Sequence, residues 1–141
     1  MKTILIADPE YGAGSVAEAF QREGYQSIPE TSALTALEIL KQGVHIDLVI
    51  TELLFHDMDG MEFLSAVRQI APAVPVIVVT ALCSVESYLL ALNLGAAEFI
   101  NKPVSVAVLF RIVQSTLEQA RSRDFPSGEG PAAGRVSSKW T

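Results

Sequence analysis

Cysteine is almost absent from this 141-residue sequence, which contains only Cys83. A single cysteine excludes an intramolecular disulfide and a metal site built from several thiolates. Long apolar runs are also missing, and none approaches the roughly 18 residues that a membrane span requires. The apolar stretch at the N-terminus is too short for a signal peptide, because Asp8 interrupts it. These absences favour a protein of the cytosol with no membrane contact.

Basic residues are scarce in the first 120 positions, where six Lys and Arg side chains stand against fourteen Asp and Glu. A region with a formal charge of −8 repels nucleic-acid phosphates, so we expect no direct binding to DNA or RNA. Hydrophobic residues make up 50% of the chain, which is enough for a packed core and too much for a disordered protein.

Short apolar runs alternate with longer amphipathic stretches along most of the chain. The apolar runs predict strands at 3–7, 25–28, 47–51, 76–80 and 99–100. The amphipathic stretches predict helices at 15–23, 33–42, 61–70, 84–94 and 106–120. Strict alternation of this kind predicts an α/β fold, a doubly wound five-stranded parallel sheet with five helices that cover both of its faces.

The last 21 residues have a different composition. Residues 121–141 are rich in Gly, Pro, Ser and Ala and show the period of neither a strand nor a helix. We therefore expect one domain over residues 1–120 and a flexible tail or linker over residues 121–141.

Polar residues stand where the expected strands end. Asp8 and Glu10 follow the first strand, Glu52 ends the third, Thr80 ends the fourth and Lys102 follows the fifth. In doubly wound folds, ligands and chemistry lie at the carboxyl ends of the strands. Carboxylates, a hydroxyl and a lysine in one crevice suit phosphate chemistry: a carboxylate can attack a phosphoryl group, the ammonium balances the developing charge, and further acids hold Mg²⁺.

Four segments resemble the motifs of response-regulator receiver domains, in the same order and at similar spacing. They are ILIADPE (4–10), DLVITELLFHDMDG (47–60), VIVVTA (76–81) and GAAEFINKPV (95–104). The resemblance covers residues 2–120. It implies the flavodoxin-like (βα)5 receiver fold and a non-enzymatic role in the phosphorelays of two-component signalling.

The resemblance also implies a role for each matching residue. Asp8 corresponds to the first acid of the acidic pocket, Thr80 to the switch hydroxyl and Lys102 to the lysine of the phosphate site. Phe99 corresponds to the rotating switch aromatic, but it lacks a tyrosine hydroxyl that would reward an alternative position, so core packing is the favoured role. The bond between Lys102 and Pro103 would be cis, in keeping with the rule that cis peptides precede proline.

Three residues depart from the family pattern at the predicted site. Glu52 occupies the phosphoacceptor position in place of aspartate, Pro9 occupies the second acidic position, and His56 replaces the usual loop proline. The glutamate carboxylate lies about 1–1.5 Å further out than that of aspartate, which disfavours in-line attack. We therefore expect a receiver that works without phosphorylation, with no catalytic residue. We expect no cofactor, or at most weak Mg²⁺ binding by Asp8 and Glu52.

By resemblance, such a domain binds a histidine kinase or an output domain through the face formed by its fourth helix, fifth strand and fifth helix, and it can form a homodimer. The residues that we expect on or near this face are Val85, Tyr88, Leu89, Leu92 and 104–110. The first alternative is a conventional receiver that accepts phosphate on Glu52 or Asp57. A more remote one is a haloacid-dehalogenase-like phosphatase, although Asp8 lacks that family's second aspartate two positions later.

Two further residues are expected to have ordinary structural roles. His56 is predicted to be an exposed loop residue, because no second histidine lies near it in the sequence. Cys83 is predicted to be packed at the start of a helix, where its thiol would be unreactive.

Overall fold

The computed structural model of the chain describes residues 1–11 and 14–123. Within these residues, five strands alternate with five helices, which confirms the predicted fold class. The strands are β1 (Thr3–Ala7), β2 (Gln26–Glu30), β3 (Leu48–Thr51), β4 (Val76–Thr80) and β5 (Glu98–Asn101). The helices are α1 (Ser15–Arg22), α2 (Ala33–Lys41), α3 (Gly60–Ile70), α4 (Val85–Asn93) and α5 (Val106–Arg123).

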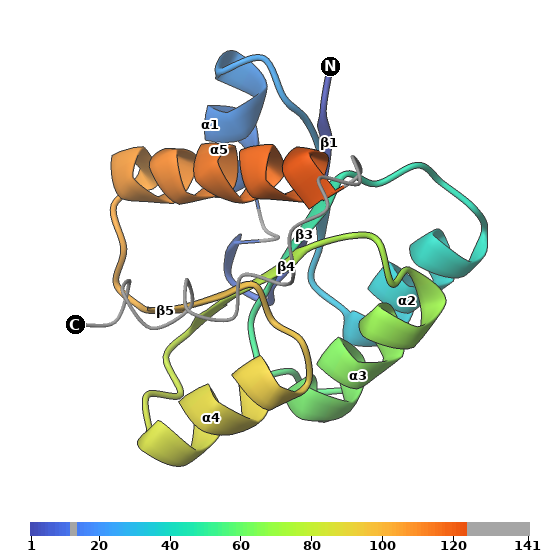
Figure 1. Cartoon of the computed structure of the whole chain (residues 1–141), viewed down its shortest axis with the longest axis vertical. Coiled ribbons are helices and arrows are strands. Elements are labelled where there is room, and N and C mark those ends of the chain that lie inside the picture. The colour runs from blue at the N-terminus through green and yellow to red at the C-terminus, as the bar shows by residue number, and fades with distance from the viewer. Residues whose placement is uncertain (12–13, 124–141) are drawn as a thin grey trace.

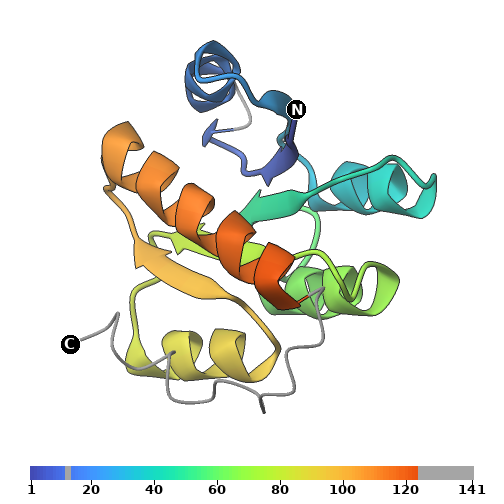
Figure 2. The same ribbon diagram turned by 45° about the horizontal axis from the view of Figure 1, so that its top comes forward.

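The strands form one parallel sheet in the order β2-β1-β3-β4-β5. Helices α1 and α5 cover one face of the sheet, and α2, α3 and α4 cover the other (Figure 1, Figure 2). Successive strands are added to the sheet in opposite directions on the two sides of β1, because β2 lies on one side of β1 and β3 on the other. This reversal creates a crevice at the carboxyl ends of the central strands, where doubly wound folds bind ligands.

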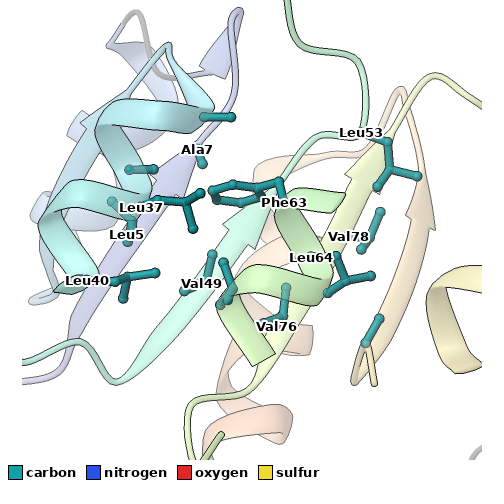
Figure 3. Packing of buried hydrophobic residues seen from close by; sticks show 14 of the residues in the cluster. Leu5, Ala7, Leu37, Leu40, Val49, Leu53, Phe63, Leu64, Val76 and Val78 are labelled. Carbon is teal, nitrogen blue, oxygen red and sulfur yellow. The ribbon is translucent and has the colours of Figure 1, made fainter. Parts of the chain in front are cut away.

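Alternating residues of the central strands supply two separate cores. In β1, Leu5 and Ala7 face the cluster under α2 and α3, whereas Ile4 and Ile6 face the cluster under α1 and α5. Figure 3 shows the first cluster, in which the ring of Phe63 from α3 lies among side chains of α2 and the sheet. Apolar residues on both faces of a strand are what a doubly covered parallel sheet requires.

The second strand is longer and begins later than the sequence predicted. It spans Gln26–Glu30, against the expected 25–28, and it includes Pro29. Proline lacks an N–H group, so its presence obscured the strand in the sequence. The sheet tolerates Pro29 because β2 is an edge strand that pairs only with β1.

The last helix also runs further than predicted, to Arg123 where the expected end was Ala120. No helix breaker intervenes, because the next proline is Pro126. The remainder of the predicted tail, 124–141, lies outside the described residues. Like the other helices in the described part of the chain, α5 is not long and apolar enough to cross a membrane.

Candidate functional site

Three charged side chains from the ends of different strands meet at the crevice. Lys102 Nζ lies 3.0 Å from Asp8 Oδ2 and 3.1 Å from Glu52 Oε2. Asp8 and Glu52 are buried, and the Lys102 side chain is only 13% exposed. The parallel strands cause this convergence, because β1, β3 and β5 all point their carboxyl ends to the same edge of the sheet.

The carboxylate of Glu52 is surrounded by hydrogen-bond donors. Its Oε1 accepts from the backbone N–H of Leu53 at 2.7 Å and of Leu54 at 3.3 Å. Its Oε2 accepts from the backbone N–H of Ala81 at 3.3 Å and pairs with Lys102. One carboxylate therefore joins the loop after β3, the loop after β4 and the lysine after β5.

The pKa values of this cluster follow from its contacts. Burial by itself would raise the pKa of Glu52, but hydrogen bonds from Thr80, Leu53 and Lys102 outweigh it and hold the pKa below its ordinary value. Burial would likewise lower the pKa of Lys102, but Asp8 and Glu52 outweigh it and raise that pKa. At neutral pH, Glu52 is thus a carboxylate and Lys102 an ammonium group.

Asp8 is held by the backbone that follows it. Its Oδ1 accepts from the N–H groups of Glu10 at 2.7 Å and Tyr11 at 2.9 Å. Its buried Oδ2 accepts no other hydrogen bond among the described residues and faces the Lys102 ammonium. Glu10 is exposed and lies 4.0 Å from Lys102, so solvent screens this pair.

Tyr11 is a site residue that the sequence analysis missed. The Lys102 ammonium lies 4.3 Å from the centre of its ring, in cation–π contact. Burial raises the pKa of the Tyr11 phenol, which therefore stays neutral. The available signal was its position directly after the acidic residues of the first strand end, opposite a lysine at the end of the last strand.

The arrangement does not fit a tightly bound divalent cation. The two carboxylates that face each other, Asp8 and Glu52, already share the Lys102 ammonium between them. Pro9 adds no third carboxylate, and residues 1–11 and 14–123 contain no group of three or more metal-ligating side chains placed to hold an ion.

Comparison with known proteins agrees with this fold. The family model for the response regulator receiver domain matches residues 4–114. The chain belongs to this family. A curated relative, the transcriptional regulatory protein ZraR of Klebsiella oxytoca, is 31% identical over 131 residues, which are 92% of this chain and 29% of ZraR. The transcriptional regulatory protein GlrR of Escherichia coli is 33% identical over 98 residues, which are 70% of this chain and 22% of GlrR. The chain thus spans less than a third of either relative.

Solved receiver structures match almost over their full length. The CheY-like receiver domain protein of Methanospirillum hungatei superimposes with a TM-score of 0.83 at 27% identity, covering 87% of this chain and 98% of that protein. The beryllofluoride-activated NtrC4 receiver domain dimer gives a TM-score of 0.78 at 26% identity, with coverages of 85% and 98%.

In this receiver domain, Asp57 points away from the site and caps a helix. Its carboxylate accepts from Ser32 Oγ at 2.7 Å and from the Leu34 N–H at 3.0 Å, at the N-terminus of α2. The hydrogen bonds from Leu34 and Ser32 lower the pKa of Asp57. From the sequence, Asp57 was considered as an alternative phosphoacceptor. Its capping role was not predicted, because its partners lie more than 20 residues earlier in the chain. His56 is exposed, as predicted.

Thr80 and Phe99, which the resemblance matched to the family's switch residues, are both buried. Thr80 hydrogen-bonds the Glu52 carboxylate and accepts from the Leu82 N–H at 2.9 Å. Phe99 packs edge-to-face against Tyr88, with 5.7 Å between ring centroids. The peptide bond between Lys102 and Pro103 is cis, as the resemblance implied.

The prediction for Cys83 was wrong, because its side chain is exposed. The loop after β4 turns outward before α4 begins, and Ser84 caps the helix through its hydrogen bond from the Ser87 N–H at 3.0 Å. Cys83 precedes this cap and lies outside the packed face of α4. Its Sγ is 3.7 Å from the carbonyl oxygen of Thr80.

Proposed function

We propose that this receiver domain transmits signals without being phosphorylated, by binding protein partners. One observation carries the proposal: the Glu52 carboxylate contacts Lys102, Thr80 and the backbone N–H groups of both neighbouring loops. By resemblance to the family, the lysine and the hydroxyl are the groups that a phosphorylated aspartate would engage. Glu52 thus supplies an anion to them permanently.

The substitution is chemically incomplete. A carboxylate carries one negative charge and two acceptor oxygens, against nearly two charges and three oxygens for a phosphoryl group. In this receiver, the smaller negative charge of Glu52 matters less for binding the Lys102 ammonium, because Asp8 also pairs with that ammonium. Because both carboxylates are already paired with the Lys102 ammonium, we propose that the domain works without a cofactor and without catalysis.

A conventional, phosphate-accepting receiver is the competing function. Its substitute acceptor would be Asp57, whose carboxylate is engaged by Ser32 and Leu34 at the start of α2. Its other acceptor would be Glu52, whose two oxygens are both hydrogen-bonded and whose charge is paired with Lys102. Both carboxylates are held by hydrogen bonds, which supports the phosphorylation-independent proposal.

The proposed partner surface is the face formed by α4, β5 and α5. Several apolar side chains on it are exposed, among them Val85, Leu89, Val106 and Val108. We propose that a sensor kinase or a regulatory output domain binds there, by analogy with the transcriptional regulatory relatives. The NtrC4 receiver is described as a dimer, so a second copy of this chain is the other partner to test. We place this activity in the cytoplasm, in keeping with bacterial response regulators.

Phosphodonor treatment tests the proposal. The purified chain and its Glu52→Asp variant are incubated with Mg²⁺ and acetyl phosphate, and their intact masses are measured. We expect the wild type to remain unmodified, because its carboxylate is displaced and occupied. The shorter aspartate is expected to gain one phosphate. A wild-type chain that gains phosphate refutes the proposal, and the modified residue is then mapped, beginning with Asp57.

A further inference from the structure

A second apolar surface lies outside the α4, β5 and α5 face. It is a groove of about 350 Å³ between the first half of α4 and the segment that joins β3 to α3. We name it the α3–α4 groove. Leu54 on one wall is 49% exposed, and Leu82 and Leu90 on the other are 40% and 45% exposed. The remaining lining residues are Leu53, Phe55, Met58, Asp59, Gly60, Met61, Glu86 and Ser87.

Exposed leucines on both walls suit a partner that presents a narrow apolar stripe. An amphipathic helix has this form, and it binds by laying residues at positions i, i+3, i+4 and i+7 into a groove. The thioethers of Met58 and Met61 add side chains that adapt to the partner's shape.

The charges at the groove define the partner further. Its charged lining residues are Asp59 and Glu86, and among the described residues that line it there is no lysine or arginine. Glu62, in the first turn of α3, is also exposed. Residues 1–120 as a whole carry a formal charge of −8, which attracts cationic partners. The complementary helix therefore carries basic residues on both sides of its apolar stripe.

Both walls of the groove are attached to Glu52. Its Oε1 accepts from the N–H groups of Leu53 and Leu54, which belong to the first wall. Its Oε2 accepts from Ala81, whose neighbour Leu82 begins the second wall. The Leu82 N–H in turn donates to Thr80 Oγ1. The same carboxylate that replaces a phosphoryl group therefore fixes the separation of the two walls.

We propose that the α3–α4 groove binds an amphipathic, basic helix of a partner protein, and that Glu52 holds the groove in its binding form. The link to Glu52 deepens the proposed phosphorylation-independent function and rests on it. The groove itself rests on its lining and its charges.

A synthetic helix tests the groove directly. The probe is a peptide of leucine and lysine with its leucines at helical spacing, long enough for about four turns. It is titrated into the ¹⁵N-labelled full chain, with a leucine and glutamate peptide of the same apolar stripe as control. We expect the basic peptide to shift the amides of Leu54, Met61, Leu82 and Leu90. We expect the acidic peptide to bind about tenfold more weakly or worse.

Matched variants distinguish binding in the groove from nonspecific attraction of the peptide to the acidic or apolar surface. Leu90→Ser is expected to weaken the basic peptide about tenfold, whereas Leu34→Ser, at a leucine of α2 that is 53% exposed, leaves its affinity unchanged. Glu86→Lys should weaken binding more than Glu38→Lys, which changes the net charge equally but lies on α2. Equal effects within either pair overturn the proposal. So do the absence of binding and amide shifts that cluster at Val85 and Val108.

The Glu52→Ala variant tests the second half of the proposal. It removes the acceptor that joins the two walls, so peptide affinity is expected to fall about tenfold while the groove side chains remain. Unchanged affinity refutes the role of Glu52. These results are separable from the phosphodonor test, because a chain that resists acetyl phosphate yet ignores the peptide contradicts only the groove. A chain that accepts phosphate yet binds the peptide contradicts only the proposed function.

Discussion

Replacing Lys102 with methionine is expected to lower the free energy of unfolding by about 3–5 kcal/mol at pH 7. The substitution keeps much of the side-chain volume but leaves the buried carboxylates of Asp8 and Glu52 facing each other without a cation. Losing one partner of a buried ion pair costs more than the pair contributes, because the remaining charge stays desolvated. Urea denaturation monitored by circular dichroism measures this loss of stability. An unchanged slope of the unfolding free energy against urea concentration would indicate that unfolding remains two-state.

The double variant Glu52→Gln/Lys102→Met is the matched control. We expect it to recover part of the lost stability, because Glu52 is then neutral while the buried carboxylate of Asp8 still lacks its cation. Acid pH gives a second control. Without Lys102, Glu52 loses a hydrogen bond and a positive charge that lower its pKa, so this variant is expected to lose less stability than the wild type as the pH falls. In the wild type the pKa of Glu52 is lowered, so its contribution is present above the ordinary value of 4.5 and is lost as the pH falls. The gap between the two proteins should narrow on acidification. A loss under about 1 kcal/mol at pH 7 would mean that the pair behaves like an exposed one.

Gly60→Ala is expected to destabilise the domain by about 3 kcal/mol or more, the upper end of the cost of overpacking. A Cβ at this position would overlap backbone atoms of Leu53, and a backbone cannot rotate away as a side chain can. The tight turn between Leu54 and Asp59, which form an isolated antiparallel bridge, brings Gly60 against that strand end. Because Leu53 donates to Glu52, the displacement should also disturb the site.

Gly43→Ala is the comparison for this prediction. Gly43 has open space around its Cα but a φ of +78°, so alanine there costs about 1–2 kcal/mol of backbone strain without a clash. Thermal unfolding of both variants measures the two losses of stability. If Gly60→Ala destabilises the domain no more than Gly43→Ala does, the predicted backbone clash between residue 60 and Leu53 is wrong.

The sequence predicts the fold well because its signals are local. The run from Val76 to Thr80 is apolar without interruption, and it forms the predicted strand with the same bounds. The fourth helix was expected to begin at residue 84, and Ser84 caps it through its hydroxyl. The edges of the sheet were harder to predict. The strand that contains Pro29 depends on having a partner on one side only, and this is a property of the sheet rather than of the segment.

The site was predictable as far as strand order determines it. Asp8, Glu52 and Lys102 were expected together because parallel strands bring their carboxyl ends to one edge, and the structure places them within ion-pair distance. Contacts between distant segments were not predictable. Asp57 caps a helix that begins more than 20 residues earlier in the chain. Tyr11 contacts Lys102, although the two residues lie near opposite ends of the domain's sequence. No local pattern encodes either contact.

Beryllofluoride provides the most direct measurement of the central claim, that the Glu52 carboxylate takes the place of a phosphoryl group. This anion mimics a phosphoryl group on an aspartate and is added with Mg²⁺ to the ¹⁵N-labelled wild type and to Glu52→Asp. The account predicts that the amides of Leu53, Leu54 and Ala81 in the wild type do not move. In the Glu52→Asp variant the same amides should shift towards their wild-type positions. Wild-type amides that shift on addition of beryllofluoride would contradict the account, because the site would then still accept the group that Glu52 is proposed to replace.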